Sequence, residues 1–266
     1  GFDRSEAIHA CREHELGLLL DRWERAKEGE GQVVLLYGEP GIGKSRLVRA
    51  LRERLDREAY TPLSHYCSQH HQTSPLHPVI ELLERAAGFK RDDQPEQRLK
   101  KLEALLNLSA DNIAAVTPLI AALLLIPTGE RYPPLNMSPQ RQKELTLEAL
   151  VDQFVGLAGR QPVVAAYEDV HWSDATTLEL LDRVVDRVQT LRVLVIVTFR
   201  PEFLAPWTRY SHVSSLTLGH LSRRQGAAMV ERVAGGKSLP AALLERIVAK
   251  PDGVPLFVEE LTRAVL

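Results

Sequence analysis

The sequence has few cysteines and no long hydrophobic run. Only two of its 266 residues are cysteines, Cys11 and Cys67, too few for a disulfide framework and typical of a reducing compartment. The longest apolar candidate, Leu119 to Ile126, ends at Pro127 and falls short of the roughly 18 residues that a membrane-spanning helix needs. No secretory signal opens the chain. We therefore expect a cytoplasmic protein that does not act in the membrane.

The chain also lacks a strong charge of either sign. Its 33 Lys and Arg residues against 35 Asp and Glu residues give a formal net charge of -2, so nucleic acid is not an expected partner of this module. The length suffices for one large domain, or for one domain with a small appendage. The last residues, 261–266, stop in the middle of a helical pattern, so we expect an excised module of a longer protein.

One glycine-rich segment fits the phosphate-binding P-loop pattern G-x-x-x-x-G-K-[ST]. An apolar run at 33–37 precedes it and predicts a buried parallel strand, and the apolar spacing over 46–55 predicts a helix after it. Strand, glycine loop and helix form the context that the pattern requires, so we predict a site for a nucleoside triphosphate. The segment consists of Gly38, Glu39, Pro40, Gly41, Ile42, Gly43, Lys44 and Ser45.

Each residue type in this loop suits a triphosphate. Glycines let successive backbone amides turn toward the phosphate oxygens, and the helix that starts near Gly43 adds its positive end. Lys44 supplies a charge for the β- and γ-phosphates, and Ser45 supplies a hydroxyl ligand for Mg²⁺.

Two adjacent acids follow the apolar run at 163–167, which predicts another strand. A strand that ends in paired carboxylates is the Walker B arrangement, in which one acid holds Mg²⁺ and the other orients or deprotonates the attacking water. Neighbouring residues of a strand point to opposite sides, so Glu168 and Asp169 can differ in role. The residues alone do not fix which acid does which; we favour Glu168 near the metal and Asp169 near the water. The predicted metal-ligating set is Ser45, Glu168 and Asp169.

A fourth strand is predicted over 191–197, beside the P-loop strand, and it leads into Thr198-Phe199-Arg200. A threonine and an arginine at such a tip could sense the γ-phosphate. Arg200 could equally pair with surface carboxylates, because exposed arginines are common. Both readings stay open at this point.

The remaining patterns complete an α/β fold, in which helices flank a parallel sheet of about five strands. We expect a P-loop nucleotide-binding domain over 1–218, with a helical insertion at roughly 77–158, and the start of a helical lid over 219–266. Cys67, His70, His71 and His77 cluster in the sequence, but their spacing fits no structural zinc pattern, so a loop is favoured there. The other expected elements are helices at 6–28, 178–188, 222–234, 239–249 and 256–266, strands at 61–67 and 213–218, and a loop at 127–139.

Four motifs in order resemble the nucleotide-binding module of STAND ATPases, a signalling branch of the AAA+ proteins. More narrowly, the chain resembles the predicted-ATPase module of bacterial adenylate/guanylate cyclase-like multidomain regulators. The resemblance covers essentially the whole chain and rests on segments 38–47, 168–174, 197–203 and 253–261.

The resemblance implies further site residues. Arg12 corresponds to a family element near the adenine, although Cys11 stands where the family has glycine. Thr198 and Arg200 match the sensor position, and Pro255 matches a lid proline near the base. The implied nucleotide-binding set is Arg12, Glu39, Pro40, Gly41, Ile42, Gly43, Lys44, Ser45, Arg46, Thr198 and Pro255, and the implied catalytic set is Lys44, Glu168, Asp169 and Arg200.

The resemblance also implies a Mg²⁺-dependent ATPase that cycles slowly between ADP and ATP states. Its partners would be cyclase-like or tetratricopeptide domains of the same polypeptide, and a homo-oligomer could supply an arginine finger. A binding-only nucleotide scaffold is the main alternative, and the intact pair of acids argues against it. A small-molecule kinase would need an arginine-rich lid, which the sequence does not show, and a DNA-stimulated ATPase has no supporting motif.

Overall fold

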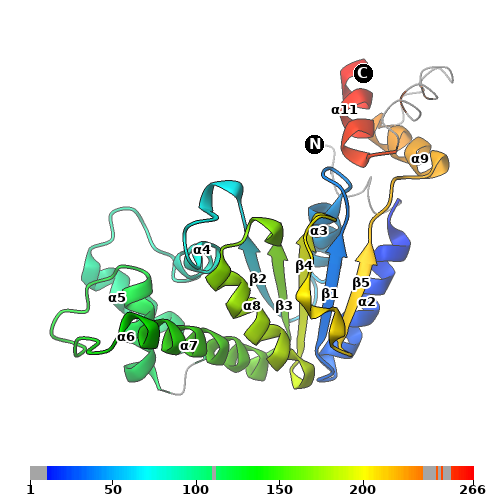
Figure 1. Ribbon diagram of the computed structural model, residues 1–266. Helices are drawn as coiled ribbons and strands as arrows, with labels where there is room; N and C mark the ends of the chain where they lie inside the picture. Colours follow the sequence, from blue (N-terminus) through cyan, green and yellow to red (C-terminus); the bar gives the residue numbers. More distant parts are fainter. Residues whose placement is uncertain (1–10, 110–111, 236–243, 245–246, 248–252) are drawn as a thin grey trace.

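The computed structural model describes residues 11–109, 112–235, 244, 247 and 253–266 (Figure 1). Five parallel strands form one sheet in the order β2-β3-β4-β1-β5. The P-loop strand β1 lies between β4 and β5, so the fourth strand of the chain is its neighbour, as the sequence predicts. The strands are β1 (Gln32–Tyr37), β2 (Thr61–Tyr66), β3 (Val163–Glu168), β4 (Val193–Phe199) and β5 (Val213–Thr217).

The central strands are buried on both faces because helices cover each side of the sheet. Along β1, Val33 and Leu35 belong to one hydrophobic core, whereas Val34 and Leu36 belong to the other. Helices α2 (Glu13–Lys27) and α3 (Lys44–Arg54) pack on the second face through residues such as Leu19 and Leu47. This alternation explains why the strands read as continuous apolar runs.

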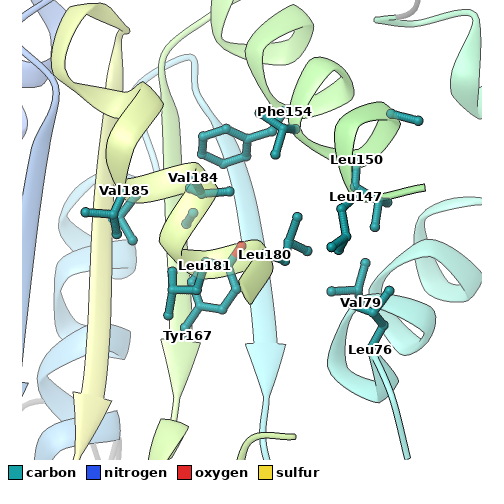
Figure 2. Close-up of a cluster of buried hydrophobic side chains, with 14 of the residues drawn as sticks. Leu76, Val79, Leu147, Leu150, Phe154, Tyr167, Leu180, Leu181, Val184 and Val185 are labelled. Atoms are coloured by element: carbon teal, nitrogen blue, oxygen red, sulfur yellow. The ribbon is translucent and has the colours of Figure 1, made fainter. Parts of the chain in front are cut away.

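The first face is covered by helices from the middle of the chain. Figure 2 shows side chains of α4, α7 and α8 meeting there, with Tyr167 of β3 among them. Helices α5 and α6 lie farther out, beyond the β2 edge of the sheet (Figure 1). The connection over 127–138 contains neither helix nor strand, which confirms the predicted loop. The helices are α4 (His77–Ala86), α5 (Pro95–Leu106), α6 (Ile113–Leu123), α7 (Pro139–Arg160) and α8 (Ala175–Arg187).

The C-terminal helices lie beyond the carboxyl end of β1, on the same side as the P-loop (Figure 1). Helices α9 (Arg223–Val233) and α11 (Pro255–Val265) pack against each other around a third core that includes Met229, Val230 and Val258. Pro255 occupies the first turn of α11, where its missing N–H costs nothing. This small helical unit therefore stands over the end of the sheet at which the nucleotide is expected.

Several helix and strand boundaries differ from those that the sequence predicts. Strand β4 starts at Val193 instead of Leu191, because residues 188–190 form a 3-10 turn, and it runs on to Phe199. The prediction that Thr198 lies beyond the strand is therefore wrong. The helix predicted from residue 6 is described only from Glu13, and most of the helix predicted at 239–249 lies outside the described residues. Within the described parts of the chain, no helix has the length and apolar character needed to cross a bilayer.

Candidate functional site

The P-loop backbone takes conformations that suit glycine. Gly41 and Gly43 have φ angles of 76° and 102°, in the left-handed region that other residues rarely adopt. A Cβ atom on Gly38 would lie 2.7 Å from the carbonyl oxygen of Leu218. Three glycines of the motif are thus each required by local geometry, and the loop between β1 and α3 forms as the pattern predicts.

Lys44 is the first residue of α3, and its ammonium group is buried against this loop. It donates to the carbonyl oxygens of Gly38 (2.7 Å) and Glu39 (3.0 Å). Burial lowers the pKa of Lys44, the negative charge of Asp169 acts against that shift, and the charge of Arg200 adds to it. A cation is therefore held within the loop, with an acid and a second cation nearby.

The two acids at the end of β3 occupy different surroundings. Glu168 is buried, and that burial raises its pKa, while the neighbouring Ser45 hydroxyl acts in the opposite direction. Asp169 has a left-handed backbone with φ 57°, and its N–H donates to Thr198 Oγ1 at 2.9 Å. The Asp169 side chain is 45% exposed. One acid thus lies beside Ser45 and the other faces solvent, which is the divergence that the strand geometry predicts.

A cavity of about 260 Å³ brings most of the predicted site together. It combines the P-loop with the tips of β3 and β4 and with the start of α11, segments far apart in the sequence. Leu256 is the one lining residue that the sequence did not single out. The cavity is lined by Pro40, Gly41, Gly43, Lys44, Ser45, Arg46, Asp169, Arg200, Pro255 and Leu256.

Some predicted nucleotide ligands lie outside this cavity. Arg12 is buried and donates to the carbonyl oxygens of Gly219 (2.5 Å) and Ile42 (3.5 Å), so it ties the P-loop to the segment that follows β5. The Ile42 side chain is buried in the core around α3. Glu39 is exposed, and its carboxylate lies 3.1 Å from His220 Nε2. These three side chains contact protein groups around the loop, and their place in the nucleotide-binding set stays a prediction.

Thr198 also stays out of the cavity. It is fully buried in β4, and its hydroxyl accepts the hydrogen bond from the backbone of Asp169. Its contact with the site is therefore indirect: it fixes the backbone that carries the exposed acid.

Arg200 lines the cavity instead of pointing away from the site. Its guanidinium carbon lies 5.4 Å from the centre of the Trp172 ring, a cation–π contact. Among the described residues no ion pair is found for it, so the sensor reading of Arg200 has the better geometric support.

The lid touches the P-loop through two polar contacts that sequence reasoning missed. The N–H of Leu256 donates to the carbonyl oxygen of Gly41 at 3.2 Å. The buried carboxylate of Glu259 pairs with Arg46 of α3 and with Arg263 of its own helix (2.8 Å). Both lid residues lie in the 253–261 motif, and the signal that the sequence offers is the spacing of Glu259 four residues before Arg263, which lies just after the motif.

The donor set at Ser45, Glu168 and Asp169 fits Mg²⁺, which prefers hard oxygen ligands. Glu168 is a buried carboxylate whose pKa burial raises, so a cation beside it would offset the cost of its charge. The other suspected group does not form a metal site: His71 and His77 stack on each other, and Cys67 Sγ lies 3.0 Å from Ser173 Oγ. Across the described residues, no cluster of three or more His, Cys, Asp or Glu side chains could hold a metal ion.

Comparisons with known proteins show the family of the chain. The family model described as "AAA ATPase domain" (AAA_16) matches residues 9–196, more than half of the chain. Uncharacterized protein R02095 of Rhizobium meliloti (strain 1021) is 30% identical over 258 residues, which is 96% of this chain and 25% of that protein. The chain thus spans about a quarter of the length of this curated relative.

Two solved structures align with most of the chain. Thermotoga maritima RuvB aligns with a TM-score of 0.50 and 16% identity, covering 97% of this chain and 61% of that one. A STAND protein with a tetratricopeptide repeat sensor from Pyrococcus horikoshii aligns with a TM-score of 0.46 and 13% identity, covering 96% and 32%. The first likeness supports the P-loop fold alone, and the second is too distant to assign a role.

Proposed function

The chain belongs to the AAA ATPase domain family, and on that premise we propose that it is an ATP-hydrolysing switch module of a multidomain bacterial signalling protein. One observation carries the proposal: a single cavity is lined by the P-loop, by Asp169 and Arg200, and by Pro255 and Leu256 of the lid. A nucleotide bound there would touch both parts of the molecule at once. The curated relative is about four times as long as the segment that matches it, which supports a module within a longer regulator.

The residues divide the chemistry between them. The P-loop amides and Lys44 hold the phosphates, and Arg200 faces the charge that develops on the γ-phosphate. Asp169 orients the attacking water and accepts its proton. Ser45 and Glu168 would hold Mg²⁺, which when bound neutralises phosphate charge. The water oxygen bonds to the γ-phosphorus as the bond between the γ-phosphorus and the β–γ bridging oxygen breaks, and that oxygen leaves with ADP.

The contacts of α11 with the P-loop and α3 link nucleotide binding to the position of the lid. Gly41 belongs to the P-loop, Arg46 directly follows it in α3, and these two residues contact Leu256 and Glu259 of α11. A nucleotide that moves either residue changes the contact energy of the lid, and a ligand shifts an equilibrium only through such a difference. We propose that ADP favours the closed lid, that ATP releases it, and that slow hydrolysis resets the module. A neighbouring subunit could supply a further arginine.

A binding-only nucleotide scaffold remains the alternative, and a single-turnover assay separates it from the ATPase. With the protein in excess over radiolabelled ATP, we expect conversion to ADP when Mg²⁺ is present and no conversion with EDTA. Excess protein makes a slow enzyme visible because each site has to turn over only once. If labelled ATP stays intact while a filter assay shows it bound, the scaffold reading holds and the ATPase proposal is wrong.

The proposed lid contact predicts faster ADP release when its ion pair is broken. Glu259→Gln removes a buried charge that Arg46 and Arg263 share, so we expect ADP to dissociate about tenfold faster or more. Stopped-flow release of a fluorescent ADP analogue measures this rate. Glu179→Gln is the control away from the lid, because Glu179 also pairs with two cations, Lys143 and Arg183, but lies on α8 and is 38% exposed. Equal release rates in both variants would show that the contact does not hold the nucleotide.

A further inference from the structure

His171 is a partly buried histidine whose two ring nitrogens have no hydrogen-bond partner among the described residues. Its side chain is 10% exposed, and both Nδ1 and Nε2 are shielded from solvent. Buried polar atoms are nearly always paired, because a buried donor or acceptor without a partner destabilises the fold. A cost of this kind is often retained at a site where the group acts once a ligand is bound.

The ring lies next to the acid that faces the cavity. Nδ1 of His171 is 4.0 Å from Oδ1 of Asp169, which is just beyond hydrogen-bonding distance. The centre of the His171 ring lies 4.9 Å from that of Trp172, the residue over which Arg200 lies. The charged groups that act on it are Asp169, Arg200, Lys44 and Glu202.

Asp169 has a fixed backbone and a carboxylate that is not fixed. Its N–H is bound by Thr198 and its φ angle is left-handed, so the chain direction at this residue is set. Its side chain is 45% exposed, and no hydrogen bond to its oxygens is found in the described part of the chain. A small rotation of this carboxylate would close the gap to His171, and hydrogen bonds at catalytic sites often shorten only when substrate binds.

We propose that His171 is a positioning residue, which donates a hydrogen bond from Nδ1 to the Asp169 carboxylate and so leaves the other carboxylate oxygen aimed at the attacking water. The inference rests on the proposed ATPase function and adds a residue to it. In the hydrolytic step the water proton passes to Asp169, the water oxygen bonds to the γ-phosphorus, and ADP leaves with the electrons of the broken bond. His171 keeps its own proton throughout.

A packing role for His171 makes the opposite prediction about substitutions. Phenylalanine fills the volume of the ring but has no donor, whereas asparagine is smaller and keeps an N–H group near the place of Nδ1. If the ring only fills space, His171→Phe should be the milder change. If it positions Asp169, His171→Asn should be milder, and His171→Phe should lower kcat about ten- to one-hundredfold with KM for ATP unchanged.

The test measures kcat and KM for Mg-ATP with wild type, both His171 variants, and His171→Phe combined with Asp169→Asn. We expect the double variant to be no slower than Asp169→Asn alone, because a residue that acts through another shows no additional effect once that other is lost. His65→Phe is the matched control: His65 is a buried histidine with an unpaired Nδ1, but it stacks on Tyr167 within the sheet, and its variant should keep wild-type kcat.

Two results would overturn the inference. Wild-type kcat in His171→Phe, or an additive loss in the double variant, would remove His171 from the positioning of Asp169 while leaving the ATPase intact. If the wild-type protein itself hydrolyses no ATP, the proposed function fails instead, so the two failures are distinguishable. Thermal unfolding of each variant shows whether a loss of rate reflects loss of the fold.

Discussion

Lys44→Ala is expected to weaken ATP binding about a hundredfold or more and to abolish turnover. The Lys44 ammonium lies inside the loop, where it donates to the carbonyl oxygens of Gly38 and Glu39. Phosphate oxygens carry a greater negative charge than those carbonyls, so the ammonium has a stronger partner once a triphosphate is bound. A hydrogen bond to a charged group contributes about 1.5–3 kcal/mol, and Lys44 would make contacts to both the β- and γ-phosphates.

Calorimetry of Mg-ATP binding and the shift in unfolding temperature on adding Mg-ATP both measure this effect. We expect the nucleotide-free variant to unfold near the wild-type temperature, because a buried cation that pays a desolvation cost is removed along with its hydrogen bonds. The nucleotide-induced shift should disappear. Arg49→Ala is the control, since Arg49 lies on the same helix but is exposed and pairs only with Glu53 in the contacts found. Unchanged ATP affinity in Lys44→Ala would contradict the assignment of this loop as the phosphate site.

The sheet could be predicted because each central strand is buried on both faces. Val33 to Leu36 divide between two cores, so every position of β1 must be apolar, and the pattern is visible without a structure. The sequence predicts the ends of the strands less well, and β4 is an example. Leu191 and Arg192 precede that strand, and Thr198 belongs to it, because a 3-10 turn at 188–190 delays its start. An apolar pattern does not distinguish such a lead-in from the strand itself.

The sequence predicts the candidate site best where one short segment carries the pattern, and less well where distant segments meet. Residue type and spacing alone place the P-loop between β1 and α3 and the two acids at the end of β3. The prediction that Arg12 lies near the nucleotide comes from the resemblance alone, and the hydrogen bonds of its guanidinium to the carbonyl oxygens of Gly219 and Ile42 depend on tertiary packing. Leu256 and Glu259 were missed for the same reason, since only the docking of α11 on the loop gives them a role.

Neutral substitutions of the two adjacent acids are expected to change different properties, kcat for Asp169 and the effect of Mg²⁺ on ATP affinity for Glu168. Asp169→Asn should lower kcat about a hundred- to ten-thousandfold, the range for loss of a general base, while ATP still binds. Asp169 is exposed to the cavity and can reach a water, and asparagine keeps its shape without accepting a proton. Glu168→Gln should instead remove the increase in ATP affinity that Mg²⁺ causes, because Glu168 lies beside Ser45, the other proposed ligand of the cation. Glu168 is not among the residues that line the cavity, so it is not expected to contact the attacking water.

A stability measurement separates these roles further. Burial raises the pKa of Glu168, so its ionised form is disfavoured in the folded state, and the stability of the nucleotide-free protein falls as pH rises through the interval above its ordinary pKa. Glu168→Gln should therefore raise the unfolding temperature at neutral pH while it weakens the response to Mg²⁺. Such a result would mean that the Glu168 carboxylate destabilises the nucleotide-free protein and contributes only when a cation is bound. That behaviour is typical of a ligand-binding residue and not of a core residue. If Glu168→Gln lowered both stability and turnover while Asp169→Asn abolished the Mg²⁺ response, the roles assigned to the two acids would have to be exchanged.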